Sequence, residues 1–388
     1  MRRLVFLALF LAALPQAFGQ SAATTPGAGL PKDPRAVFTA AAALYNFNDP
    51  TLKPWHMKAS YQLFDEKGNP GDLGTFEYWW ATPKVFRATW TRGDTTYTEW
   101  HTADGNVAYE EKGSGINFYD DYLQTAFLSP LPGQAEIDPA KFKFARHLDK
   151  LGDDKVDCIM VVPNMPDNPF MSDVQNLPSG MFPTYCFNPV APALQVASTY
   201  GSLSSYYDHI TVMQGNLLPR KVMLYDNKRP IVKAELVAMN GIKPDDPALT
   251  PTATALHPKG DKVTLKPEEA EALLIKKVKP IQPQGGGPMM GMGGGSVSLF
   301  ATIGIDGKVR NIHGQFSMSA ALTAAALTAV SQWQYKPYMQ DGVPVEVDTT
   351  INVDFGNGKG GGGGGGPRGG GGGRGGGGGG GGGGMPPH

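Results

Sequence analysis

The chain has 388 residues, enough for two domains with a linker, and its 52 glycines and 33 prolines are unevenly distributed. Its formal net charge of -1 argues against a general polyanion binder, so nucleic acid is not an expected partner. Most of the glycine excess follows Phe355, where only a few basic residues interrupt the run. Such a run cannot bury apolar surface, so the sequence predicts a disordered tail over residues 357–388.

The amino-terminal segment has the pattern of an export signal. Arg2 and Arg3 precede an apolar run from Leu4 to Leu14, and Ala17–Gly19 supplies small residues for cleavage. This order is typical of a secretory signal peptide, expected over residues 1–19. The run falls short of a membrane-spanning helix, which needs about 20 apolar residues. A retained membrane anchor is the competing interpretation.

Residues 33–242 are predicted to form one β-rich domain. A short amphipathic helix is expected after Asp33, which can cap it, because Pro34 suits the first helical position. From Trp55 to Leu63 apolar and polar residues alternate, which is the period of a half-buried strand. Short turns containing Gly or Asp then separate further β-rich runs, and this spacing predicts an antiparallel meander.

Large aromatic residues are concentrated in this meander. They could line a pocket for an acyl chain or another apolar ligand, or they could form the core of a twisted sheet. Adjacent Trp79 and Trp80 must point to opposite faces if their strand is regular. The residues in question are Trp79, Trp80, Trp90, Tyr97 and Trp100.

The two cysteines, Cys158 and Cys186, lie in apolar, strand-like contexts. In an exported protein an isolated pair most simply forms one disulfide, and two cysteines alone cannot build a tetrahedral metal site. No metal or cofactor is therefore expected.

Catalytic motifs are not found: the chain has no Gly-x-Ser-x-Gly, no His-Glu-x-x-His and no phosphate-binding loop sequence. Paired carboxylates occur in turn-like contexts at Asp120-Asp121, Asp153-Asp154 and Asp245-Asp246. Such pairs are usually solvated, so we expect a protein that is not an enzyme.

Residues 243–295 are predicted to be a linker, because prolines and polar residues recur there and a Gly- and Met-rich run ends it. One short helix is expected within it, from Pro267 to Lys277. Its acidic first turn and basic last turn complement the helix dipole.

Residues 296–356 predict a small domain of two strands, a helix and a third strand. A β-rich run to Ile303 leads to Asp306-Gly307, which is a strong hairpin signal. Apolar residues at helical spacing follow as far as Trp333, and Pro337 ends that helix. The last strand alternates without a break from Val345 to Phe355. Its inward residues are Val345, Val347, Thr349, Ile351, Val353 and Phe355.

These motifs resemble the carboxyl-terminal domain of TonB-family energy transducers. The signature residues that carry the resemblance are Asp306, Gly307, Trp333, Tyr335 and Pro337. The resemblance covers residues 263–356 and implies that the last strand pairs edge-to-edge with the TonB box of an outer-membrane TonB-dependent receptor. Gln282-Pro283 stands where the family has Tyr-Pro, which puts receptor contacts by that element in doubt. The family's long charged spacer is also missing.

The amino-terminal domain resembles, less specifically, the LolA/LolB-like lipoprotein-carrier fold. The residues that carry this resemblance are Pro83-x-x-Phe86-Arg87 and the segment from Asp104 to Tyr109. The resemblance implies a half-barrel: a curved, open antiparallel sheet around an apolar cavity that helices close. The expected fold class of the whole chain is α+β.

Together these features predict an exported, periplasmic protein that docks to TonB-dependent receptors or other envelope partners, without force transduction. The alternative is a LolA-like carrier of lipid or another apolar ligand. A retained amino-terminal segment would instead favour an energy transducer.

Overall fold

The computed structural model describes residues 29–65, 67–113, 116, 118–165, 173–177, 181–200, 203–226, 229–258, 262–281, 296–314 and 320–355. The predicted signal peptide, the Gly- and Met-rich end of the predicted linker and the predicted tail lie outside these ranges. None of the helices in the described ranges has both the length and the apolarity to cross a bilayer.

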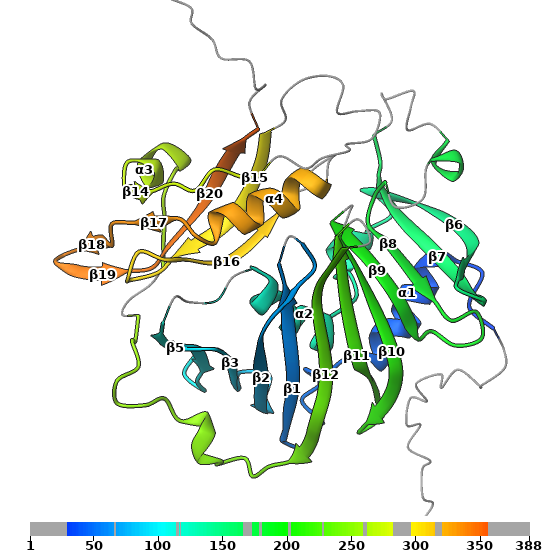
Figure 1. Ribbon diagram of the computed structural model, residues 1–388, viewed down its shortest axis with the longest axis horizontal. Helices are drawn as coiled ribbons and strands as arrows, with labels where there is room; N and C mark the ends of the chain where they lie inside the picture. The colour runs from blue at the N-terminus through cyan, green and yellow to red at the C-terminus, as the bar shows by residue number, and fades with distance from the viewer. Residues whose placement is uncertain are drawn as a thin grey trace, which may run out of the picture.

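A twelve-stranded antiparallel sheet forms the amino-terminal domain (Figure 1). Its strand order is β5-β4-β3-β2-β1-β12-β11-β10-β9-β8-β7-β6, so two meanders meet where β1 pairs with β12. The strands are β1 (Trp55–Phe64), β2 (Pro70–Thr82), β3 (Val85–Arg92), β4 (Thr95–His101), β5 (Val107–Lys112), β6 (Phe142–Leu151), β7 (Asp154–Pro163), β8 (Thr184–Phe187), β9 (Leu194–Tyr200), β10 (Leu203–Met213), β11 (Asn216–Asp226) and β12 (Arg229–Gly241).

Two helices cover one face of this sheet. Helix α1 (Pro34–Leu44) begins where the Asp33 carboxylate accepts a hydrogen bond from the Arg35 amide at 3.1 Å, as the predicted cap requires. It places the Phe38 ring 5.4 Å from that of Tyr185 on β8. Helix α2 (Phe118–Leu128) leads the chain from β5 to β6 and stacks Phe127 on Phe76 of β2. Helix α1 thus packs on β8 and β11, whereas α2 lies across the middle of the sheet, where it contacts β2, β11 and β12.

Asp120 and Asp121 belong to helix α2, not to a solvated turn, which corrects the expectation from the sequence. The Asp120 side chain is fully buried because it faces the sheet, where Tyr61 and Arg92 bind its carboxylate. A pattern of apolar residues did not reveal this helix, since the side that it buries is partly polar.

The carboxyl-terminal unit contains a four-stranded sheet in the order β13-β20-β15-β16, with helix α4 packed on it. Strand, strand, helix and strand follow one another as predicted, so the α+β class is confirmed for both parts of the chain. The elements are β13 (Val263–Thr264), α3 (Pro267–Glu271), β14 (Leu274–Lys276), β15 (Ser296–Ile303), β16 (Val309–Gly314), α4 (Ala320–Val330), β17 (Gln334–Tyr335), β18 (Tyr338–Gln340), β19 (Val343–Val345) and β20 (Val347–Asp354).

The β15–β16 turn needs its glycine for two reasons. Gly307 has a φ of 77°, a conformation that other residues rarely adopt. A Cβ at this position would also overlap the main-chain carbonyl of Tyr335. The Asp306 side chain closes the turn by accepting a hydrogen bond from the Lys308 amide at 3.1 Å.

The segment predicted as a linker packs on the two sheets over much of its described length. Val263 pairs with Val347 of β20, and Leu274 pairs with Tyr335 of β17. Earlier in the segment, the Ala248 carbonyl accepts a hydrogen bond from the Trp100 indole at 3.0 Å. Its proline content does not prevent this, because its scattered apolar residues bury themselves on neighbouring sheets instead of forming a core of their own.

Candidate functional site

Strand β20 carries the residues that the sequence predicted to bind a partner. Val347, Thr349, Ile351 and Val353 point into the core of the carboxyl-terminal unit. The predicted strand, however, divides before Val347. Val345 belongs to β19 and pairs with Tyr338, while buried Glu346 separates the two strands. The side-chain alternation of the sequence did not show this break.

The two edges of β20 differ in how far they are paired. Strand β15 covers one edge along its whole length, from Ile303 opposite Val347 to Ser296 opposite Asp354. On the other edge β13 pairs only with Val347 and Asp348. The described residues provide no strand partner for this edge beyond Asp348, although helix α3, which follows β13, also contacts β20. We call the stretch of this edge without a strand partner the open edge.

The open edge can be assigned to individual main-chain groups. The Glu346 carbonyl accepts a hydrogen bond from the Val263 amide at 3.0 Å, and the Asp348 carbonyl accepts one from the Leu265 amide at 3.1 Å. Within a strand the N–H and C=O of one residue point to the same edge, and the edge alternates from residue to residue. Thr350, Asn352 and Asp354 therefore present their main-chain groups to the open part.

Polar side chains line the solvent side of β20. Thr302 donates a hydrogen bond to Asp348 at 2.7 Å, and Ser298 donates one to Asn352 at 2.7 Å. These cross-strand contacts hold β20 against β15. With Asp354 they give the strand a polar, acidic face, which discourages indiscriminate pairing of the open edge.

The signature residues stabilise the unit from the side away from this edge. Tyr335 donates its main-chain N–H to the Gly307 carbonyl at 2.8 Å, and the Trp333 indole donates to the Val278 carbonyl at 2.8 Å. Asp306 holds Arg310 through both carboxylate oxygens, at 2.6 and 2.7 Å. Exposed Pro337 follows β17. Their role in this structure is to hold the hairpin against the end of helix α4.

Arg310 also joins the two parts of the chain. Its guanidinium lies 4.0 Å from the centre of the Tyr109 ring on β5 and 3.6 Å from the Glu111 carboxylate, which also pairs with Lys308. Burial alone would raise the pKa of Asp306, but its hydrogen bonds and attraction to Arg310 outweigh this and lower that pKa. The β15–β16 hairpin is therefore fixed on the edge of the large sheet.

A cavity of about 110 Å³ lies at this junction, between β4, β5, α2 and β16. Acidic and basic side chains line it together: Glu99, Glu111 and Asp121 from the amino-terminal domain, and Lys308 and Arg310 from the carboxyl-terminal unit. Asp121 is an exposed residue, yet its carboxyl lines this cavity, where desolvation by neighbouring protein groups, followed by the charges of Glu99 and Asp120, raises its pKa to about 7.

The raised pKa of Asp121 predicts a specific dependence of stability on pH. The folded chain holds this proton to about pH 7, whereas the ordinary pKa is 3.8, so the free energy of unfolding falls as the pH rises between these values. Asp121→Asn removes the ionisable carboxyl, so the variant does not lose this part of its free energy of unfolding as the pH rises. It should therefore be more stable than wild type at pH 8. Urea unfolding at pH 5 and pH 8 tests this, with exposed Asp154→Asn as the control. Equal pH profiles for wild type and Asp121→Asn would contradict it.

The predicted aromatic pocket residues do not share one face of the sheet. Trp80 stacks on Trp55 at 6.1 Å and Trp90 on Phe76 at 5.2 Å, and with Tyr97 these side chains form the core beneath the helices. Trp79 and Trp100 lie on the opposite face, where both rings contact the Arg87 guanidinium. Three of the five residues therefore pack in the main core, and an apolar ligand pocket formed by these residues stays a prediction.

Cys158 and Cys186 are joined in the structure, with an S–S distance of 2.08 Å. They lie directly opposite each other on β7 and β8. This bond ties two strands near the β6 edge of the large sheet.

Comparison with solved structures finds likeness over the amino-terminal part of the chain. A LolA superfamily protein from Nitrosomonas europaea shares 9% identity at a TM-score of 0.29, over 56% of this chain and 97% of that one. An outer membrane lipoprotein-sorting protein domain, described as putative, from Vibrio parahaemolyticus shares 7% sequence identity at a TM-score of 0.33. The likeness covers 52% of this chain and 90% of that one. A DUF1329 family protein from Desulfovibrio piger shares 7% sequence identity at a TM-score of 0.33, over 53% of this chain and 92% of that one. Because these TM-scores are below 0.5, the fold of this domain rests on its own topology.

Comparison with curated proteins finds no match. The model of one protein family, Gram-negative bacterial TonB protein C-terminal, matches residues 290–356. These residues contain the hairpin, helix α4 and strand β20, which are the elements that carried the resemblance in the sequence. The carboxyl-terminal unit of this chain is thus similar to the C-terminal domain of Gram-negative bacterial TonB proteins.

Proposed function

We propose that this protein binds an extended segment of an outer-membrane TonB-dependent receptor by strand addition to the open edge of β20. The observation that carries the proposal is the unequal pairing of β20, which β15 covers completely and β13 covers only to Asp348. The match of residues 290–356 to the TonB C-terminal family supports the choice of partner. The proposed location is the periplasm, reached through the predicted signal peptide.

The open edge fits a short peptide. From Thr350 to Asp354 it is five residues long, or roughly 16 Å at 3.3 Å per residue. A bound peptide continues the position in the sheet that β13 begins, and its main chain pairs with Thr350, Asn352 and Asp354. Because Asp354 is exposed on the solvent face, a basic side chain at the facing peptide position strengthens the complex.

The amino-terminal sheet acts in this proposal as the scaffold that holds the docking strand. The contacts of Arg310 and Lys308 with β5 fix the carboxyl-terminal unit on that scaffold. We do not extend the proposal to lipid carriage, since the described aromatic side chains pack against one another and against α2. The function proposed is docking, without catalysis.

Asn352→Pro tests the docking edge. Proline removes the N–H that points to the open edge, leaves the pairing with β15 intact and is tolerated in edge positions. We expect the binding free energy of the peptide to weaken by at least about 0.5–1.5 kcal/mol, which is the usual contribution of one hydrogen bond. The loss should exceed this contribution because the proline ring also obstructs the incoming strand. Fluorescence anisotropy of the full chain with TonB-box peptides from receptors of the same organism measures this.

The matched control is Asn352→Ala, which keeps the main-chain N–H and should bind nearly as wild type does. Circular dichroism establishes that both variants are folded. The proposal fails if no TonB-box peptide from that organism binds the full chain, or if a folded Asn352→Pro variant binds as tightly as Asn352→Ala.

A further inference from the structure

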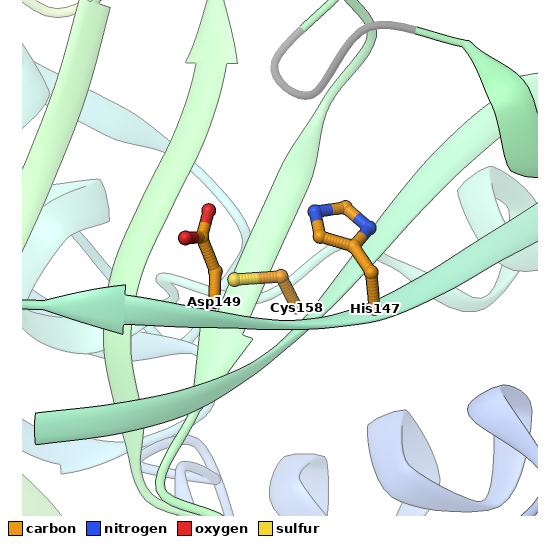
Figure 2. A group of neighbouring side chains, drawn as sticks. All are labelled: His147, Asp149 and Cys158. Atoms are coloured by element: carbon orange, nitrogen blue, oxygen red, sulfur yellow. The ribbon is translucent and has the colours of Figure 1, made fainter.

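A group of metal-ligand side chains lies far from the docking strand, at the β6 edge of the large sheet. The ligand atoms of His147, Asp149 and Cys158 all lie within 4.8 Å of one another. Figure 2 shows the three side chains projecting from neighbouring strands toward a common space. Within the described ranges this is the one such group.

Strand register explains why these residues meet. His147 of β6 lies directly opposite Cys158 of β7, and Cys158 lies directly opposite Cys186 of β8. Asp149 is two residues beyond His147, so its side chain is on the same face of the sheet. Two neighbouring strands therefore bring one imidazole, one carboxylate and the Cys158 sulfur together, and the disulfide holds the Cys186 sulfur of the third strand next to that of Cys158.

The disulfide makes this group a poor metal site in the structure as it stands. A thiolate is the form of cysteine that binds a metal, and both sulfur atoms are occupied by their mutual bond. Cys158 and Cys186 are 2% and 8% exposed and pack against Val156, Leu151 and Val196. Half-buried His147 and exposed Asp149 lie on the solvent side of the sulfur atoms, so an ion has a path to them.

We propose that reduction of the Cys158–Cys186 disulfide opens a zinc site made of Cys158, Cys186, His147 and Asp149. A dithiol supplies the two electrons: it gives its two hydrogens to the protein sulfurs and becomes a disulfide itself. Zn²⁺ then binds the two sulfurs and displaces both protons into solvent. Two thiolates and one carboxylate supply three negative charges, which more than neutralise the two positive charges of the ion.

The donor set selects zinc on chemical grounds. Two sulfurs, one imidazole nitrogen and one carboxylate oxygen suit an ion of intermediate softness that prefers four ligands. Bonds of about 2.0–2.3 Å place tetrahedral ligand atoms about 3.3–3.8 Å apart. To reach this spacing, side-chain rotation has to shorten separations of up to 4.8 Å among the His147, Asp149 and Cys158 ligand atoms by about 1 Å and to move the two sulfurs, now 2.08 Å apart, roughly 1.7 Å further from each other.

Cobalt titration of the full-length chain tests the site. The chain is reduced with a phosphine under nitrogen, and a thiol assay checks that both cysteines are free. Co²⁺ should then produce thiolate-to-metal charge-transfer absorption and the visible bands of a tetrahedral ion, and one equivalent of Zn²⁺ should abolish them. The oxidised chain should show neither signal.

Variants assign the remaining ligands. His147→Ala and Asp149→Ala should each weaken Zn²⁺ binding to the reduced chain by more than the about 10–100-fold that loss of an outer-shell partner causes. His209→Ala is the matched control, because this histidine is 61% exposed and lies on β10. It should change neither the cobalt spectrum nor the zinc affinity.

Three results would overturn the proposal. The first is a folded chain with two free thiols and no thiolate-to-cobalt band. The second is an unchanged zinc affinity in His147→Ala, or equal affinity in the oxidised and reduced chains. The third is a chain that cannot be reduced without losing its native circular dichroism, because the site then never forms in the folded protein.

Discussion

Asp120→Ala is expected to lower the free energy of unfolding by about 3–5 kcal/mol, the usual effect of removing one partner from a buried ion pair. Asp120 is fully buried on helix α2. Its carboxylate accepts hydrogen bonds from Arg92 at 3.2 and 3.0 Å and from the Tyr61 hydroxyl at 2.7 Å. The substitution leaves the charge of Arg92 and the hydroxyl of Tyr61 without this acceptor under the helix. Urea unfolding monitored by tryptophan fluorescence measures the loss.

Neighbouring variants separate charge from packing. Tyr61→Phe removes one hydroxyl and should cost about 1 kcal/mol. At pH 8 the adjacent Asp121→Asn should have the opposite effect from Asp120→Ala, since Asp120 pairs with Arg92, whereas Asp121 forms no ion pair with any residue that the structure describes. A loss below about 1 kcal/mol for Asp120→Ala would mean that Arg92 finds solvent and that the pair does not anchor α2.

The sequence predicted elements whose side chains follow one regular period. The alternation in β1 and β20 and the Asp306-Gly307 turn each identify an element from local information. The structure places β1 and the turn as expected, whereas the predicted last strand begins only at Val347. Local periods do not show which strands pair across long distances. The two halves of the large sheet meet where β1 pairs with β12. This pairing brings together residues about 180 positions apart in the sequence, such as Trp55 and Gly241.

In the candidate site, too, local side-chain patterns were predictable from the sequence and long-range strand pairing was not. The inward and outward residues of β20 were predictable, but its open half depends on β13, a two-residue strand within an apparent linker. Likewise the aromatic residues were recognised as important, while their division between two faces follows from β2–β3 and β3–β4 register. The side chains of His147 and Cys158 also lie close together because of strand register alone. Contacts between strands depend on register, which a one-dimensional pattern specifies only weakly.

Arg310→Met is expected to loosen the contact of the carboxyl-terminal unit with the β5 edge of the large sheet, while the contact of α4 with β9 remains, and to cost about 3–5 kcal/mol. The side chain is 11% exposed, holds Asp306 with two hydrogen bonds and lies over Tyr109. Methionine fills most of the volume but leaves the Asp306 charge half-buried and unpaired. The measurement combines urea unfolding with limited proteolysis of the segment 242–262, which should be cut faster once the units separate.

Arg310→Lys separates charge from geometry, because lysine keeps the positive charge but cannot make the two parallel hydrogen bonds to Asp306. We expect it to recover part of the lost stability. Peptide binding should survive in Arg310→Met, since Arg310 lies on β16, which β15 separates from β20 in the sheet. Docking and its attachment to the scaffold are then separable. Unchanged proteolysis together with lost peptide binding would contradict this, because Arg310 would then support β20 itself and not the junction with β5.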